Sequence, residues 1–181
     1  MTYGELAERT ARIASYLQAN GVGPGDRVAI HLPNSVDWVE ACLGIVRAGA
    51  VAVPMSFDAT TEEITYRIKD AQCVAAFGRP QRLDLLREAS PAIHVIAFEN
   101  GEGEAGAEGS AGQPPRDPLD MERPAFIIYT SGTTGRAKGV VLSLQGMLWV
   151  TAACWAPIAG LSADDYVLNS LPLYHSYALN L

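Results

Sequence analysis

The sequence predicts an α/β fold in which mostly parallel strands are covered by helices. Short apolar runs alternate along the chain with longer segments that repeat their apolar residues at helical spacing. The short runs are apolar at almost every position, as in strands that a parallel sheet buries on both faces. Glycine, proline or capping residues separate these segments and mark where each one starts or stops.

The first helix is expected to begin after Thr2 and to end before Gly21. Thr2 and Glu5 have the spacing of a capping box, in which each side chain accepts a hydrogen bond from the other residue's backbone amide. Gly21 ends the helix because glycine adopts the left-handed conformation at the lowest cost. A strand at 27–32 follows.

The second helix is expected to be mostly buried and to run to about Arg47, with Asn34 or Ser35 as its cap. One narrow stripe interrupts its apolar surface. The stripe consists of Asp37, Glu40, Gly44 and Arg47.

A second capping box, formed by Thr60 and Glu63, predicts the start of the third helix. The other expected elements are strands at 50–54, 73–77, 94–98, 125–128 and 140–143 and a helix at 82–89.

The composition is that of a globular chain, with 181 residues, 49% of them hydrophobic and 18% charged. A net charge of −7 argues against nucleic acid as a main partner. The longest apolar stretch, 148–161, is too short to span a bilayer and contains Pro157 and Gly160, which favours a buried helix. The N-terminus lacks the apolar core of a signal peptide.

The cysteines and histidines offer no metal site. Cys42, Cys73 and Cys154 lie far apart, without zinc or disulfide spacing, so we expect a reducing, cytoplasmic setting. His31 and His94 lie in strand-like runs and are interpreted as structural. The three tryptophans are interpreted as core residues; they are Trp38, Trp149 and Trp155. Cys154 is interpreted as an inert buried thiol.

Residues 99–118 break the α/β pattern. They contain five glycines, three prolines, five carboxylates and one arginine, and they have no apolar residue larger than alanine. Such a segment cannot bury enough surface to offset the entropy lost on ordering. It predicts a flexible acidic linker or loop between an α/β portion at 1–98 and a second portion at 119–181. An acidic docking segment is the alternative.

The stretch YTSGTTGRAKG, residues 129–139, carries the clearest chemistry. It leaves a buried strand and combines three glycines, four serine or threonine hydroxyls, and the cations Arg136 and Lys138. Glycines let backbone N–H groups approach a ligand closely, and consecutive N–H groups form an anion site. Because ligands of α/β sheets sit beyond the carboxyl ends of strands, the stretch predicts a polyphosphate site. An ordinary glycine-rich loop is the alternative.

A Walker A loop is excluded on two grounds. Ala137 stands where that motif needs glycine before the lysine, and Gly139 stands where it needs serine or threonine. The following residues, 140–143, are typical of a strand, whereas a Walker loop opens a helix. A P-loop ATPase or kinase is therefore disfavoured.

SGTTGRAKG closely resembles the phosphate-binding signature of the adenylate-forming (AMP-binding) superfamily, which includes acyl-CoA and aryl-CoA ligases and peptide-synthetase adenylation domains. Three further motifs appear in that family's order: MTYGEL (1–6), VRAGAVAVPM (46–55) and LPLYHSYALN (171–180). Ala137 departs from the family's usual proline. The resemblance implies the N-terminal part of the large domain of an adenylate-forming enzyme.

The resemblance also implies a reaction, in which a carboxylate attacks the α-phosphate of ATP and pyrophosphate leaves. Mg²⁺ would assist through ligands mostly outside this chain, and CoA is the expected acceptor. The residues expected around the β- and γ-phosphates are Thr130, Ser131, Gly132, Thr133, Thr134, Gly135 and Lys138.

His175 is the expected catalytic residue, since the family places this histidine near the carboxylate and the α-phosphate. Such a histidine can donate a hydrogen bond to an anionic oxygen without being charged. Taken alone, a structural histidine is the alternative. Tyr177 is expected to line the acyl pocket, with simple packing as its alternative.

Three functions fit these expectations. The first is the N-terminal portion of an acid–CoA ligase for a fatty or aryl acid. The second is a peptide-synthetase adenylation domain with a carrier-protein thiol as acceptor, and the third is a non-catalytic phosphate-binding module. Because the sequence ends at Leu181, before the family's later motifs and C-terminal domain, we expect this portion not to be competent alone. We also expect it to dimerise through an open sheet edge.

Overall fold

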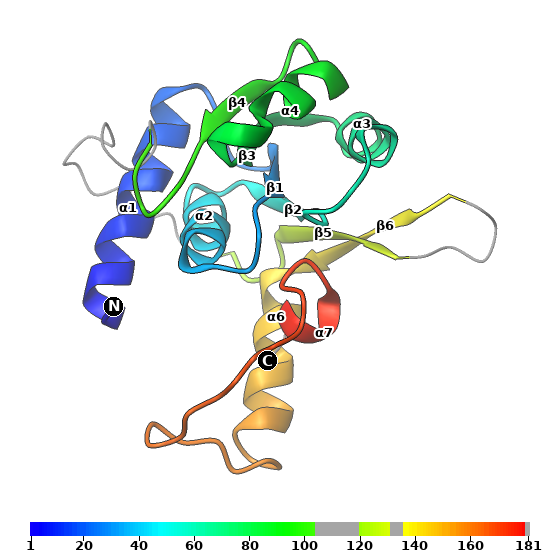
Figure 1. The fold of residues 1–181 in the computed structure, drawn as a ribbon. Coiled ribbons are helices and arrows are strands. Elements are labelled where there is room, and N and C mark those ends of the chain that lie inside the picture. The colour runs from blue at the N-terminus through cyan, green and yellow to red at the C-terminus, as the bar shows by residue number, and fades with distance from the viewer. Residues whose placement is uncertain (104–119, 131–135, 180–181) are drawn as a thin grey trace.

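The computed structural model describes residues 1–103, 120–130 and 136–179, which form one six-stranded sheet covered by helices (Figure 1). The strand order is β4-β3-β1-β2-β5-β6; neighbouring strands are parallel except β5 and β6, which are antiparallel. The expected α/β fold with a mostly parallel sheet is confirmed. The strands are β1 (Arg27–His31), β2 (Val51–Pro54), β3 (Cys73–Gly78), β4 (His94–Ala97), β5 (Pro124–Thr130) and β6 (Lys138–Ser143).

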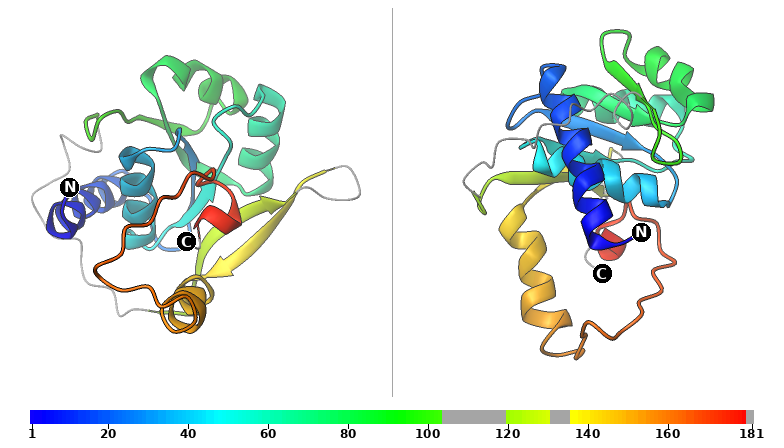
Figure 2. Two further views of the ribbon diagram at one scale, coloured as in Figure 1. Left: turned by 60° about the horizontal axis from the view of Figure 1, so that its bottom comes forward. Right: turned by 90° about the vertical axis from the view of Figure 1, so that its left-hand side faces the viewer.

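Helices cover both faces of the sheet (Figures 1 and 2). One buried cluster joins α1 and α2 to one face, and a second joins α3 and α4 to the other. The helices are α1 (Tyr3–Ala19), α2 (Val36–Arg47), α3 (Thr61–Asp70), α4 (Leu83–Ala89), α6 (Leu144–Val150) and α7 (Ser176–Leu179), with a 3₁₀ turn at Pro80–Arg82 and a π-helical turn at Thr151–Trp155.

Both expected capping boxes are present. The hydroxyl of Thr2 accepts from the amide of Glu5, and that of Thr60 accepts from the amide of Glu63, with both glutamates bonding back to the cap. Ser35, the second of the two candidates, caps α2. Helix starts are therefore set by local sequence, and each bond satisfies an amide that the helix leaves unpaired.

The polar stripe of α2 faces the interior. Asp37 and Glu40 are 4% and 1% exposed, whereas Leu43 on the apolar side is 42% exposed. The stripe lies against α1, and Gly44 lets the helices approach so closely that a Cβ there would be 2.4 Å from Cγ2 of Ile13. Small size at position 44 is thus a packing requirement.

Each buried carboxylate of α2 has a cationic partner. Glu40 accepts from Arg9 at 2.9 Å, and Asp37 accepts from Arg79 at 2.6 Å. Asp37 also accepts from the backbone amides of Asn100 and Gly101, at 2.9 and 2.7 Å. The first residues after β4 are therefore tied to α2, while 104–119 of the expected linker lie outside the described residues.

The β5–β6 hairpin leaves the body of the sheet (Figure 1). β5 pairs with β2 at Phe126 and Ala52, and among the described residues its continuation from Ile127 to Thr130 pairs with β6 alone. The outer half of the hairpin therefore lacks a strand neighbour on its β5 side.

The apolar stretch 148–161 does not form the expected buried helix. α6 and the π-helical turn cover its first half, but Trp149 is 61% and Ile158 79% exposed. Trp155 and Cys154 are half-buried, whereas Trp38 is buried as expected. The apolar composition predicted that another helix or strand packs over this stretch, but no described element does. No helix among the described residues is long and apolar enough to cross a membrane.

His31 ends β1 in full burial, and among the described residues neither ring nitrogen has a hydrogen-bond partner. Its ring stacks on that of Phe57, with centroids 5.4 Å apart. Burial, helped by the nearby Arg82 guanidinium, lowers the pKa of His31 from 6.5 to about 4. The imidazole is therefore neutral at pH 7, as its structural interpretation requires.

This burial predicts a loss of stability in acid. Between pH 6.5 and about 4 the unfolded chain binds a proton at His31 that the folded chain does not, so the free energy of unfolding falls as the pH drops. The full effect is roughly 3 kcal/mol by the usual conversion of pKa differences. Urea denaturation across this range should show a flatter pH dependence for His31→Leu than for the wild type. Parallel curves for the two proteins would contradict the prediction.

Candidate functional site

The parallel strands bring the predicted site residues to one edge of the sheet. β1, β2 and β5 run in the same direction, so their carboxyl ends lie together. Thr130 ends β5 at this edge, and Lys138 begins β6 as its register partner. The expected phosphate-binding residues between them, Ser131, Gly132, Thr133, Thr134 and Gly135, lie outside the described residues.

Thr130 and Lys138 face each other as the last described register pair of the hairpin, and their side chains are accessible. Both residues are exposed, and the Thr130 hydroxyl is 3.5 Å from the backbone oxygen of Lys138. Lys138 forms no ion pair with any of the described residues. Its ammonium group can therefore meet an anion without first breaking a salt bridge.

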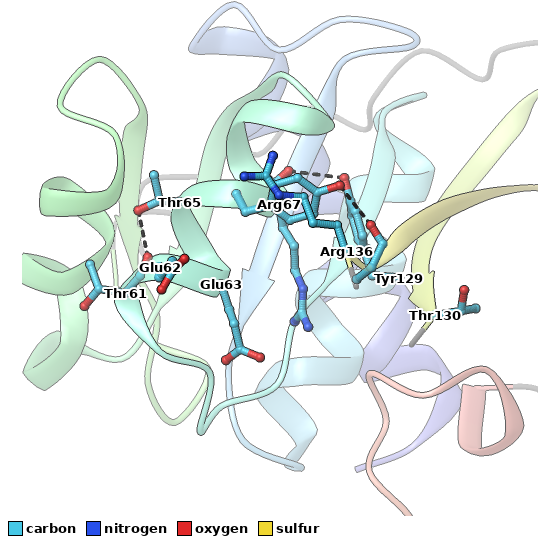
Figure 3. Close-up of a pocket in the computed structure, with 10 residues that line it drawn as sticks. Thr61, Glu62, Glu63, Thr65, Arg67, Tyr129, Thr130 and Arg136 are labelled. Atoms are coloured by element: carbon cyan, nitrogen blue, oxygen red, sulfur yellow. Dashed lines mark hydrogen bonds between the residues drawn. The ribbon is translucent and has the colours of Figure 1, made fainter. Parts of the chain in front are cut away.

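A cavity of about 680 Å³ separates helix α3 from the hairpin. Figure 3 shows side chains of α3 on one side and those of the hairpin on the other. The lining contains two arginines and two glutamates besides hydroxyl groups. Its residues are Thr61, Glu62, Glu63, Thr65, Tyr66, Arg67, Tyr129, Thr130, Arg136 and Ala137.

Two tyrosines join α3 to the hairpin beside this cavity. The hydroxyl of Tyr66 donates to the backbone oxygen of Ala137 at 2.9 Å. The hydroxyl of Tyr129 donates to Oδ2 of Asp70 at 2.6 Å. Burial, with Asp70 adding to it, raises the pKa of Tyr129 well above its ordinary value, so this donor keeps its proton at neutral pH.

Gly139, at the end of the glycine-rich stretch, has a packing role. It pairs with Tyr129 across the hairpin, and a Cβ there would be 2.9 Å from Cγ2 of Ile127 and 3.3 Å from Cζ of Tyr129. The glycine leaves room for the Tyr129 ring on the strand surface. Ala137, the departure from the family pattern, contributes the carbonyl that Tyr66 holds.

Asn34 brings the His175 segment to the same edge. Its side chain donates to the backbone oxygen of Leu171 at 2.8 Å and accepts from the amide of Leu173 at 2.9 Å. Leu173 and Leu179 then pack against the cluster formed with α1 and α2. Figures 1 and 2 show α7, which follows His175, alongside β5.

The His175 side chain is exposed, and its Nδ1 lies 3.4 Å from the backbone amide of Tyr177. An Nδ1 that accepts this hydrogen bond leaves the proton of the neutral ring on Nε2, which can then donate outward. Tyr177 is 57% exposed and is not among the residues that line the cavity beside α3.

The described residues contain no cluster of three or more His, Cys, Asp or Glu side chains that could hold a metal ion. Mg²⁺ in nucleotide sites is commonly bound through the phosphates and one or two carboxylates.

A family model described as "AMP-binding enzyme" matches residues 1–181. The chain belongs to this family. Feruloyl-CoA synthase of an Amycolatopsis species is 32% identical over 181 residues, which are 100% of the chain and 36% of that protein. Tyrocidine synthase 3 of Brevibacillus parabrevis is 38% identical over 148 residues, which are 82% of the chain and 2% of that protein.

Solved structures agree with the fold. ATP-bound MatB from Rhodopseudomonas palustris matches with a TM-score of 0.88 and 30% identity, over 99% of this chain and 36% of that one. The chain thus spans about a third of the length of feruloyl-CoA synthase and of MatB. The expected membership in the adenylate-forming superfamily is confirmed.

Sequence reasoning missed four residues that support the site: Asn34, Tyr66, Arg67 and Asp70. Asn34 was considered only as a helix cap, and nothing in its sequence neighbours indicates a partner more than a hundred residues away. Tyr66 and Asp70 are four residues apart on α3 and share one face. That spacing was a usable signal for a polar contact surface, although it did not indicate which element lies opposite.

Proposed function

We propose that the protein is an ATP-dependent acid–CoA ligase, which activates a fatty or aryl carboxylic acid as acyl-AMP with release of pyrophosphate and then transfers it to CoA. The observation that carries this proposal is the position of Thr130 and Lys138 at the carboxyl edge of the sheet, with the His175 segment fastened to the same edge by Asn34. The relationship to feruloyl-CoA synthase supports it. Because the chain covers 36% of that relative, the activity is proposed for the whole protein.

The proposed roles follow from the charges of the reaction. Two anions must meet, and negative charge gathers on the departing pyrophosphate. Lys138, the Thr130 hydroxyl and the residues 131–135 between them surround the β- and γ-phosphates. His175 donates from Nε2 to an oxygen of the α-phosphate or the carboxylate, and Tyr177 lines the acyl pocket.

Mg²⁺ would neutralise phosphate charge when bound with ATP, and CoA would supply the thiol that accepts the acyl group. Residues 1–181 supply the phosphate-binding part of this machinery, and we propose that they do not turn over substrate alone. Their coverage of about a third of a related ligase supports this. The cytoplasmic setting inferred from the cysteines stays a prediction, and all three cysteines are free thiols.

A peptide-synthetase adenylation domain is the second candidate, favoured by the 38% identity to tyrocidine synthase 3. It would use the same phosphate-binding residues and an amino acid in place of a fatty or aryl acid. Pyrophosphate exchange that responds to amino acids, and to no fatty or aryl acid, would decide for this candidate. A non-catalytic phosphate-binding module would show no exchange with any acid.

Lys138→Ala tests the phosphate site in the full-length protein. The wild type should catalyse carboxylate-dependent exchange of pyrophosphate into ATP, and the variant should lose roughly tenfold or more in kcat/KM for ATP because a charge-assisted phosphate contact is removed. Its melting temperature should stay close to that of the wild type, since the side chain is exposed and unpaired among the described residues.

Lys69→Ala is the matched control, since Lys69 is an exposed lysine on α3 that does not line the cavity. It should keep wild-type exchange. Equal losses of stability and activity in Lys138→Ala would remove the phosphate role from Lys138, and a wild type without carboxylate-dependent exchange would overturn the proposed function.

His175→Ala should slow formation of acyl-AMP by roughly a hundredfold, the usual effect of losing one hydrogen-bond donor to a developing anion. Thiol transfer should be less affected, because in that step the thiol attacks the acyl carbon and no bond forms at the α-phosphorus. Single-turnover measurements of the two steps separate them. His175→Gln keeps a side-chain donor and should retain more of the rate, whereas an unchanged adenylation rate in His175→Ala would exclude His175 from the mechanism.

The open edge of the sheet gives a prediction about assembly. β6 is an edge strand, and Val140 and Val141 on it are 43% and 57% exposed. We propose that residues 1–181 form a dimer through this edge, since unpaired edges favour strand pairing. Light scattering should show a dimer that Val141→Lys converts to monomer. Val74→Lys, which adds the same charge on the inner strand β3, should leave the dimer intact, and a monomeric wild type would contradict the proposal.

A further inference from the structure

The outer half of the β5–β6 hairpin needs support that the sheet does not give. β2 ends at Pro54, and its described pairing with β5 is at Phe126, so Tyr129 and Thr130 extend past the last strand neighbour on that side. Val140 and Val141 on β6 are exposed as well. A two-stranded ribbon without further contacts is only marginally stable in water.

Helix α3 supplies this support from a fixed position. Ile64 and Ile68 are 0% and 2% exposed and hold the helix on the sheet, and its capped start fixes its first turn. Tyr66 and Asp70, four residues apart, face the hairpin from this helix. The helix is thus a rigid element on which a binding segment can be positioned.

The contacts fasten both sides of the turn. On the side that leaves the turn, the Tyr66 hydroxyl holds the carbonyl of Ala137 at 2.9 Å, and the Arg136 guanidinium lies 5.6 Å from the centre of the Tyr66 ring. On the side that enters it, Tyr129 donates to Asp70 at 2.6 Å.

The two tyrosines also contact each other. Their rings pack edge to face, with centroids 6.2 Å apart at 72°. This arrangement is favourable for aromatic pairs. The two sides of the turn are therefore coupled through one aromatic pair, formed by Tyr66 of α3 and Tyr129 of β5.

We propose that Tyr66 is a positioning residue, which with Tyr129 holds against α3 the two hairpin segments that flank the predicted phosphate-binding residues 131–135, and so sets the affinity for the phosphates of ATP. The inference rests on the proposed function only for the identity of its ligand, ATP. The anchoring of the hairpin to α3 does not depend on that function. A proline at position 137 would restrain the backbone through its ring, and alanine does not. Here the hydrogen bond from the Tyr66 hydroxyl restrains the carbonyl of Ala137 instead.

Tyr66→Phe tests the inference in the full-length protein because it removes one hydroxyl and keeps the ring beneath Arg136. Amide hydrogen exchange at 128–130 and 136–140 should become faster, since one hydrogen bond no longer holds these residues closed. The KM for ATP should rise about fivefold, the effect of one neutral hydrogen bond. The KM for the acid and the kcat of pyrophosphate exchange should stay within about twofold, because only phosphate binding is weakened.

Tyr16→Phe is the matched control. It also deletes a buried tyrosine hydroxyl, which lies 3.2 Å from Nε2 of His94 on the far side of the sheet from α3. It should change stability to a similar degree and leave both KM values and the hydrogen exchange of the hairpin as in the wild type. Tyr129→Phe should resemble Tyr66→Phe.

The outcomes separate this inference from the proposed function. Unchanged hydrogen exchange in Tyr66→Phe would overturn the anchoring, whether or not the protein uses ATP. Faster exchange with an unchanged KM for ATP, or with equal rises in the KM values for ATP and acid, would overturn the positioning role. Absence of carboxylate-dependent exchange in the wild type would overturn the proposed function, while the hydrogen-exchange comparison would still decide on the anchoring.

Discussion

The parallel pairing of β2 with β5 is the constraint on which the candidate site depends. It aligns the carboxyl end of β5 with those of β1 and β2, although more than sixty residues separate β2 from β5 in the chain. Reversing β5 would move Thr130 and the turn after it to the opposite edge, away from Asn34. The side chains at the site are therefore placed first by backbone hydrogen bonds and only then by their own contacts.

The two parts of the site are held from opposite faces of the sheet. Tyr66 and Asp70 support the turn from the α3 layer, where Tyr129 packs on the core of that face. Leu173 and Leu179 fasten the His175 segment to the core shared by α1 and α2. A group bound between Lys138 and His175 would thus contact both layers, and the rigid sheet between them fixes the separation of the two anchors.

Local sequence predicted most of the fold, and long-range contacts account for what it missed. The capping boxes at Thr2 and Thr60 need only four neighbouring residues, so their pattern is sufficient. The orientation of α2 was missed, because a polar stripe can face solvent or an ion partner and Arg79 lies 42 residues away from Asp37. The Tyr66–Ala137 bond joins residues 71 apart. The apolar stretch at 148–161 was expected to be buried, but its composition could not indicate that Trp149 and Ile158 stay exposed among the described residues.

The Asn34 contacts also have a consequence for the order in which the molecule comes apart. They close a loop of about 137 residues with two hydrogen bonds, while the sheet beneath is joined along whole strands. Gentle warming should release residues 171–179 before α6 unfolds, leaving β1 to β5 intact. Heat would then detach His175 from the candidate site early and reversibly, before the secondary structure of the sheet is lost.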